Sequence, residues 1–327
     1  MKTLLVGYRA ADLFETLKHG KKITAHWAAE GDVTCHCLDI YYRHAIEKTH
    51  HLKAVCSPHL PEGDWDVVKF LTGPKRMSGE LSLDMLQECH LLAGRTTGSE
   101  GSPCRLEVVF EGRERDKNAL LAKIADDPSR IRDFTARWKA SVPGGPSLEF
   151  LSYPGCFCHR RLDEGGLALA EVVSRDLAAR GESGLRLLDM GCGCGLVGFL
   201  VASVVKDVSL VMVDSHSRAV EAAQANSSSL GIPAEVILAD GGTPARMDGT
   251  FDVFAGNPPY YSDYRIAEVF LETALRALGP GGVCYTVCKN AAGLEPVQKK
   301  FFPSVEIIRR RGYAVLKSVK DASCAAK

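Results

Sequence analysis

Residues 187–196 read Leu-Leu-Asp-Met-Gly-Cys-Gly-Cys-Gly-Leu, and this stretch decides the fold. Its apolar start predicts a buried strand at 185–188, and the apolar run after it predicts a helix. Between them, Gly191, Gly193 and Gly195 stand at alternate positions. Glycine adopts positive φ and has no Cβ, so the turn can be tight and can bring bare backbone against a ligand. The N–H groups at the start of the following helix are then available to a polar or anionic ligand.

Strand and helix patterns alternate on both sides of this turn. The later strands are predicted at 209–213, 234–238, 251–255 and 283–287, with a closing antiparallel hairpin at 305–308 and 313–317. Helices are predicted at 166–180, 217–230 and 266–278. The alternation is typical of an open, mainly parallel α/β sheet, in which ligands bind beyond the carboxyl ends of the strands.

Acidic residues end the second and third of these strands. In dinucleotide-binding folds, an acidic residue at a similar sequence distance after the glycine turn binds the ribose hydroxyls, and Asp214 stands at that distance here. Taken by itself, Asp214 could equally be the N-cap of the next helix. Asp240, followed by Gly241, could equally be a turn residue. The spacing Gly-x-Gly-x-Gly after Asp189 differs from the Gly-x-Gly-x-x-Gly of an NAD site.

The fourth strand ends in Asn257-Pro258-Pro259-Tyr260, a sequence with a specific chemical use. The lone pair of an exocyclic amine on a base, or of an amide nitrogen, is delocalised and poorly nucleophilic. The Asn257 side-chain oxygen and the Pro258 carbonyl can each accept one N–H group and rotate the amine out of conjugation. Proline fixes the residue before it in an extended conformation, and Tyr260 offers a face for stacking a flipped base. The alternative interpretation is a plain strand-ending turn.

The glycine turn combined with Asn-Pro-Pro-Tyr resembles class I S-adenosylmethionine (SAM)-dependent methyltransferases. Residues 153–166, Tyr-Pro-Gly-Cys-Phe-Cys-His-Arg-Arg-Leu-Asp-Glu-Gly-Gly, are similar to the Pro-Gly-Val-Phe…Leu-Asp-x-Gly segment of ribosomal RNA guanine-N2 methyltransferases of the RsmC and RlmG type. The resemblance covers about residues 150–320. It implies a Rossmann-like, seven-stranded domain that methylates the exocyclic N2 amine of a guanine in ribosomal RNA, with SAM as cofactor.

The resemblance also implies roles for individual residues. Phe157 and Asp163 would help close the cofactor site, while Asp214 would bind the ribose and Asp240 the adenine. The complete implied cofactor set is Asp189, Gly191, Cys192, Gly193, Gly195, Asp214, Ser215, Asp240, Gly241, Phe157 and Asp163, and the catalytic set is Asn257, Pro258, Pro259 and Tyr260. The sequence departs from the family pattern at Tyr260-Tyr261, where Phe and His are usual, and at Cys158-His159, where Ser and Arg are usual. These departures leave the exact target open.

The first part of the chain carries a similar alternation. Strands are predicted at 4–6, 33–38, 54–56, 65–71 and 106–110, and helices at 10–19, 40–48, 82–93 and 119–140, the last interrupted around 126–128. The Pro- and Gly-rich stretch 141–147 predicts a linker, which divides the chain into domains at 1–145 and 146–327. The resemblance implies that the first domain is a degenerate methyltransferase-like copy that serves RNA docking or stability. An unrelated small α/β domain is the alternative.

Other functions compete with methylation of ribosomal RNA. A protein glutamine N5-methyltransferase acting on release factors shares Asn-Pro-Pro-Tyr, but its N-terminal domain is a helical bundle. A DNA adenine-N6 methyltransferase would need a target-recognition insert, which we do not find. A non-catalytic RNA-binding or assembly protein would not need the intact glycines and Asn257. Basic residues that could contact phosphates lie at 160–161, 299–300 and 309–311. Basic clusters of this size are more often simply solvent-exposed surface.

Composition and charge limit the partners and the compartment that we expect for this protein. The chain has 327 residues and zero formal net charge, which argues against a broadly basic nucleic-acid coat. No apolar run is long enough to cross a bilayer, so we expect a cytoplasmic protein that does not bind membranes. We also expect a monomer. We expect the twelve cysteines to be reduced and to pack as small apolar side chains. Cys35-His36-Cys37 contains no Cys-x-x-Cys pair, and we expect no metal.

Overall fold

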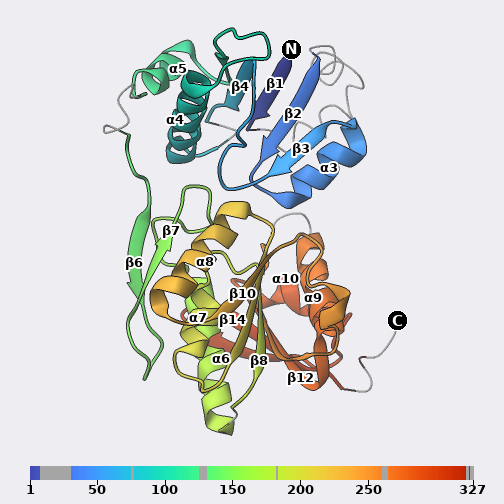
Figure 1. Ribbon diagram of the computed structural model, residues 1–327. Coiled ribbons are helices and arrows are strands. Elements are labelled where there is room, and N and C mark those ends of the chain that lie inside the picture. The colour runs from blue at the N-terminus through green and yellow to red at the C-terminus, as the bar shows by residue number, and fades with distance from the viewer. Residues whose placement is uncertain are drawn as a thin grey trace. The chain divides into compact units, whose positions relative to one another are not determined.

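The computed structural model describes residues 1–7, 31–74, 77–124, 131–181, 183–259, 264–321 and 324. The chain divides into two compact units (Figure 1). The first comprises Met1–Thr135 together with His216–Arg218, and the second comprises Ala136–Ser215 and Ala219–Lys327. In the described residues, no helix is long and apolar enough to cross a membrane, and no group of three or more His, Cys, Asp or Glu could hold a metal.

The second unit contains a seven-stranded sheet in the order β10-β9-β8-β11-β12-β14-β13. Its strands are β8 (Arg186–Met190), β9 (Ser209–Asp214), β10 (Ala234–Leu238), β11 (Phe251–Gly256), β12 (Leu278–Cys288), β13 (Glu306–Arg310) and β14 (Tyr313–Val319). The first five in this order are mutually parallel, and β14 pairs antiparallel with β12 and β13. The predicted Rossmann-like sheet and closing hairpin are therefore confirmed.

Helices cover both faces of this sheet, as Figure 1 shows. One face packs against α6 (Glu164–Arg180), α7 (Leu196–Ala202) and α8 (Ser217–Leu230), and the other against α9 (Arg265–Ala277) and α10 (Ala291–Gln298). Successive strand residues point to opposite faces: Leu187 lies in one core and Leu188 in the other. A strand buried on both faces carries a continuous apolar run, which is the pattern visible in the sequence.

A two-stranded hairpin, β6 (Ala136–Ala140) and β7 (Leu148–Ser152), begins the second unit. The prediction of a helix over 119–140 is wrong here: α5 (Glu114–Leu121) ends early, and β6 is extended because it pairs with β7. Trp138 stacks on Phe150 with ring centroids 5.0 Å apart, an aromatic contact worth about 1 kcal/mol. The Pro- and Gly-rich stretch forms the hairpin turn, and the two units divide ten residues before the predicted boundary.

The first unit contains a five-stranded parallel sheet in the order β3-β2-β1-β4-β5. Its elements are β1 (Lys2–Val6), β2 (Asp32–Cys37), α3 (Ile40–His50), β3 (Lys53–Cys56), β4 (Val67–Thr72), α4 (Gly79–Arg95), β5 (Arg105–Phe110) and α5. In chain order, this is the same arrangement as the first five strands of the second sheet. The helix predicted at 10–19 lies outside the described residues.

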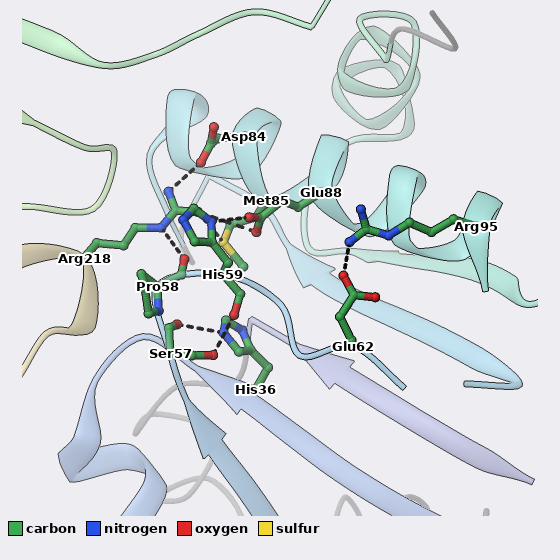
Figure 2. A network of polar contacts seen from close by, with 10 residues as sticks. All are labelled: His36, Ser57, Pro58, His59, Glu62, Asp84, Met85, Glu88, Arg95 and Arg218. Atoms are coloured by element: carbon green, nitrogen blue, oxygen red, sulfur yellow. Dashed lines mark hydrogen bonds and ion pairs between the residues drawn. The ribbon is translucent and has the colours of Figure 1, made fainter. Parts of the chain in front are cut away.

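Arg218 is the buried centre of a polar network in the first unit, drawn in Figure 2. Its side chain is 3% exposed and forms ion pairs with Asp84 at 2.5 Å and Glu88 at 3.7 Å. Its Nε donates to the Pro58 carbonyl at 3.0 Å. His59 contacts Glu88 at 2.6 Å, while burial raises the pKa of the Glu88 carboxyl. A buried guanidinium needs such partners, because an unpaired charge in the interior is strongly destabilising.

Candidate active site

The predicted site residues meet at the carboxyl edge of the seven-stranded sheet. From β8 the chain moves outward through β9 and β10, and it then returns to the other side of β8 to form β11. This reversal makes the β8/β11 junction a topological switch point, where open α/β sheets bind ligands. The glycine turn follows β8, Asp214 ends β9 and Asn257 follows β11, so the three features lie on adjacent strands.

Backbone hydrogen bonds fasten the glycine turn to β9. The N–H groups of Gly191 and Cys192 both donate to the Val213 carbonyl, at 2.8 and 3.1 Å. The Gly193 N–H donates to Oδ2 of Asp214 at 2.8 Å. Asp214 therefore binds the turn itself, which ties the acidic strand end to the glycines as one structure.

The three glycines are required for different reasons. All have positive φ, at 67° for Gly191, 56° for Gly193 and 88° for Gly195. A Cβ on Gly191 would lie 2.7 Å from the Phe270 ring, and one on Gly195 would lie 2.3 Å from the Phe199 ring. A Cβ on Gly193 would have no heavy atom within 4 Å. Gly191 and Gly195 therefore serve internal packing, whereas Gly193 borders open space.

Asp189 is buried beneath the turn and is 2% exposed. Its Oδ2 accepts the Gly198 N–H at 2.9 Å, which joins the end of β8 to α7. Burial raises the pKa of Asp189 to about 7, opposed by the Gly198 hydrogen bond and assisted by the negative charges of Asp214 and Asp163. The carboxylates of Asp214 and Asp163 are thus close enough to act on Asp189.

A fully buried asparagine that the sequence analysis missed braces the same region. Asn226 of α8 donates to the carbonyls of Leu151 and Cys194, at 3.0 and 2.9 Å, and accepts the Leu151 N–H at 2.9 Å. It links β7 to the glycine turn. No sequence signal marks it, because its partners lie far away along the chain.

Asn257 contacts the start of α6. Its Nδ2 donates to Oδ2 of Asp163 at 2.8 Å, and Asp163 caps α6 by accepting the Gly165 N–H on Oδ1 at 3.0 Å. Pro258 is buried and Pro259 half-buried. The predicted stacking residue, Tyr260, lies outside the described residues.

The remaining predicted cofactor residues follow β9 and β10 or lie on the segment before α6. Asp240 and Gly241 follow β10, the strand beside β9, where Asp240 is half-buried and Gly241 exposed. Ser215 follows Asp214 and is half-buried. Phe157 is 67% exposed on the segment before α6. The structure therefore shows two direct contacts among the predicted site residues, one between Asp163 and Asn257 and one between Asp214 and the glycine turn.

Most of the predicted phosphate contacts are engaged in ion pairs. Arg310 and Arg311 both pair with Glu171, whose side chain is 3% exposed. Lys299 pairs with Glu295 and Lys300 with Glu268, each at 2.7 Å. Arg310 and Arg311 thus hold the β13–β14 turn on α6, while their side chains stay 42% and 39% exposed, so contact of 309–311 with phosphates remains a prediction.

Comparisons with known proteins agree with this geometry. The methyltransferase small domain family matches residues 147–317. Ribosomal RNA large subunit methyltransferase G of Pseudomonas paraeruginosa is 29% identical over 208 residues, which cover 62% of this chain and 53% of that protein. Ribosomal RNA small subunit methyltransferase C of Pseudomonas aeruginosa is 28% identical over 259 residues, covering 77% of this chain and 69% of that protein. The chain thus spans about half the length of the large-subunit enzyme.

A solved structure supports the fold independently. The 16S ribosomal RNA N2 methyltransferase RsmC of T. thermophilus, in complex with AdoMet and guanosine, superimposes with a TM-score of 0.73 at 19% identity. The match covers 98% of this chain and 88% of that one. Since the family match spans more than half of the chain and contains the glycine turn, Asp214 and Asn257, this protein belongs to the methyltransferase small domain family.

Proposed function

We propose that this protein is a SAM-dependent methyltransferase that modifies the exocyclic N2 amine of a guanine in ribosomal RNA. The observation that carries the proposal is the placement of Asn257 at the end of β11, on the strand beside the glycine turn and tied to Asp163. An oriented amide there is suited to a planar amino group. The ribosomal RNA substrate is inferred from the relatives, which are named as ribosomal RNA methyltransferases.

The residues around the glycine turn fit SAM as cofactor. The open space at Gly193 lets a ligand approach the backbone, where a side chain would obstruct it. The neighbouring Asp214 supplies a carboxylate, which accepts hydrogen bonds from ribose hydroxyls. Asp189 lies buried beneath the turn and accepts the Gly198 N–H, which holds the turn in place for a ligand. When bound, SAM supplies a methyl group activated by its positive sulfur.

The chain itself supplies orientation for the amine. The Asn257 side-chain oxygen and the Pro258 carbonyl accept its two N–H groups and favour a geometry in which its lone pair is available. Pro258 and Pro259 restrict the backbone, so these acceptors are arranged in advance. Rate enhancement then comes mainly from positioning and electrostatics.

The first unit is proposed to be a degenerate copy that serves RNA docking or stability. The shared order of five strands supports a common origin with the catalytic unit. After β4 the chain continues with Gly73-Pro74, whereas Asn257-Pro258-Pro259 follows the corresponding strand β11. The first unit thus lacks the proposed catalytic asparagine at this position. Asp39, at the position that corresponds to Asp214, caps α3 by accepting the Tyr41 N–H at 2.9 Å.

Methyl transfer from labelled SAM tests this proposal directly. The purified protein is incubated with ribosomal RNA or ribosomal subunits that lack the modification, and the RNA is digested to nucleosides for mass spectrometry. We expect label in N2-methylguanosine, and no label with Asn257→Ala that still binds SAM. Parallel reactions offer a release factor or DNA as acceptor; label in a release-factor glutamine or in DNA adenine but not in ribosomal RNA, or label in no acceptor, would overturn the proposed substrate.

A further inference from the structure

We propose that Asp163 is a positioning residue, whose carboxylate determines which end of the Asn257 amide faces the target amine. This inference rests on the proposed function and assigns Asp163 a task other than closing the cofactor site. It follows from the contact between the start of α6 and the end of β11, two segments separated by 94 residues in sequence.

The chemistry of the contact selects one amide orientation. An asparagine side chain has a donor end and an acceptor end of nearly equal size, so its environment must choose between them. An ionised carboxylate can only accept hydrogen bonds. At 2.8 Å from Oδ2 of Asp163, the Asn257 amide must therefore present its NH₂ group to the carboxylate. The oxygen is then directed to the other side, where an acceptor for the amine is required.

The carboxylate is itself held firmly. Its Oδ1 accepts the Gly165 N–H at 3.0 Å, as the N-cap of α6. A Cβ on Gly166 would lie 2.6 Å from its Oδ2, so a glycine there leaves room for the carboxylate. Both oxygens of Asp163 thus have a defined partner, one in the helix cap and one in Asn257.

Ion pairs fasten the helix that carries this carboxylate. Glu171, buried in the middle of α6, pairs with Arg310 and Arg311, and Arg311 also pairs with Glu164 at 3.1 Å. A Cβ on Gly165 would lie 3.1 Å from the Tyr313 ring, so the first turn of α6 lies close against the start of β14. A rigid element therefore sets the orientation of the amide, as precise positioning requires.

The first test is Asp163→Asn. Asparagine caps helices as well as aspartate does, so we expect the unfolding midpoint to stay unchanged. An amide at 163 can either donate or accept, and the Asn257 amide is then free to turn its NH₂ group toward the substrate. We expect kcat to fall about 10- to 100-fold, as is usual for a misplaced catalytic group, with the Kd for SAM within about threefold of the original.

An exchange of the two side chains separates positioning from loss of charge. In Asn257→Asp alone, two carboxyl groups face each other and can hydrogen-bond only while they share a proton, so activity should fall as the pH rises. In the double variant Asp163→Asn/Asn257→Asp, the amide at 163 donates to the carboxylate at 257, whose other oxygen accepts the amine. We expect this variant to regain at least tenfold in kcat over Asn257→Asp at pH 8. A purely structural role for Asp163 predicts no such recovery.

A measurement that needs no activity completes the test. The side-chain NH₂ signals of Asn257 in an NMR spectrum should show one proton shifted downfield by the carboxylate, and Asp163→Asn should remove that shift. Normal kcat in Asp163→Asn, no recovery in the double variant, or unchanged NH₂ signals would each overturn the positioning role. Absence of N2-methylguanosine with the unmodified protein would instead overturn the proposed function, and the NMR result would still decide the role of Asp163.

Discussion

Replacement of Gly193 by alanine tests whether this glycine is needed for cofactor binding as well as for the backbone conformation of the turn. Gly193 has φ of 56° and open space around its absent Cβ. Gly249, in the turn before β11, has φ of 67° and the same open surroundings, but it lies at the opposite edge of the sheet. Gly249→Ala is therefore a matched control that introduces similar strain far from the proposed cofactor.

The expected loss of stability follows from these angles. An L-residue in the left-handed region costs roughly 1–2 kcal/mol, and alanine recovers about 0.4–1 kcal/mol by restricting the unfolded chain. Each variant should therefore lose about 1 kcal/mol, which lowers Tm by about 2–4 °C in a unit of this size. Neither variant needs to displace a neighbouring atom, because no heavy atom lies within 4 Å of the new Cβ.

The two variants should differ in cofactor binding. In Gly193→Ala the methyl group occupies space that a ligand would use, so calorimetry should give at least a tenfold weaker Kd for SAM, or about 1.4 kcal/mol. Gly249→Ala should bind SAM with the original Kd. Equal destabilisation with unchanged SAM binding in both variants would refute the assignment of Gly193 to the cofactor site.

Three further substitutions test other parts of the structure. Asn257→Ala should reduce methyl transfer by at least about 100-fold while the Kd for SAM, measured by calorimetry, stays within a few-fold; normal turnover would exclude the proposed mechanism. Because the pKa of Asp189 is raised to about 7 in the folded state, the free energy of unfolding should fall as the pH rises from about 4 to 7. Asp189→Asn should lose that dependence in urea titrations and be the more stable protein at pH 8; a parallel pH profile would contradict the burial argument. Arg218→Ala should destabilise the first unit by about 1.5–3 kcal/mol in urea, since it leaves the partly buried carboxylates of Asp84 and Glu88 without their cationic partner, whereas the exposed Arg95→Ala should cost at most about 1 kcal/mol; equal effects would contradict the importance of burial.

The elements with a strong local pattern could be predicted from the sequence. Strands β8, β9 and β11 carry apolar runs because both faces of the sheet are covered there, and the glycine turn, Asp214 and Asn257 stand at or just after their ends. The glycine turn and Asn257-Pro258-Pro259 stand at such ends, so their meeting at one edge follows from parallel topology. The hairpin strand β6 alternates apolar and polar residues over only five positions, which was too short a pattern to separate it from the helix predicted across it, and its conformation depends on pairing with β7.

Long-range polar contacts could not be predicted in this way. The N-cap position of Asp163 is visible from local sequence, but its bond to Asn257 depends on how α6 packs on the sheet. The same holds for Arg310 and Arg311, which look like a basic surface in sequence and pair with the buried Glu171 in the structure. In each case the partner lies more than 90 residues away, where periodicity carries no information.

Analysis of cellular ribosomal RNA tests the central claim most directly. Ribosomal RNA from the source organism, with and without the gene for this protein, is digested and its N2-methylguanosine sites are mapped by mass spectrometry. The account predicts that one such site disappears, returns when the original gene is restored, and stays absent when the restored gene carries Asn257→Ala. Retention of every N2-methylguanosine in the strain without the gene would contradict it.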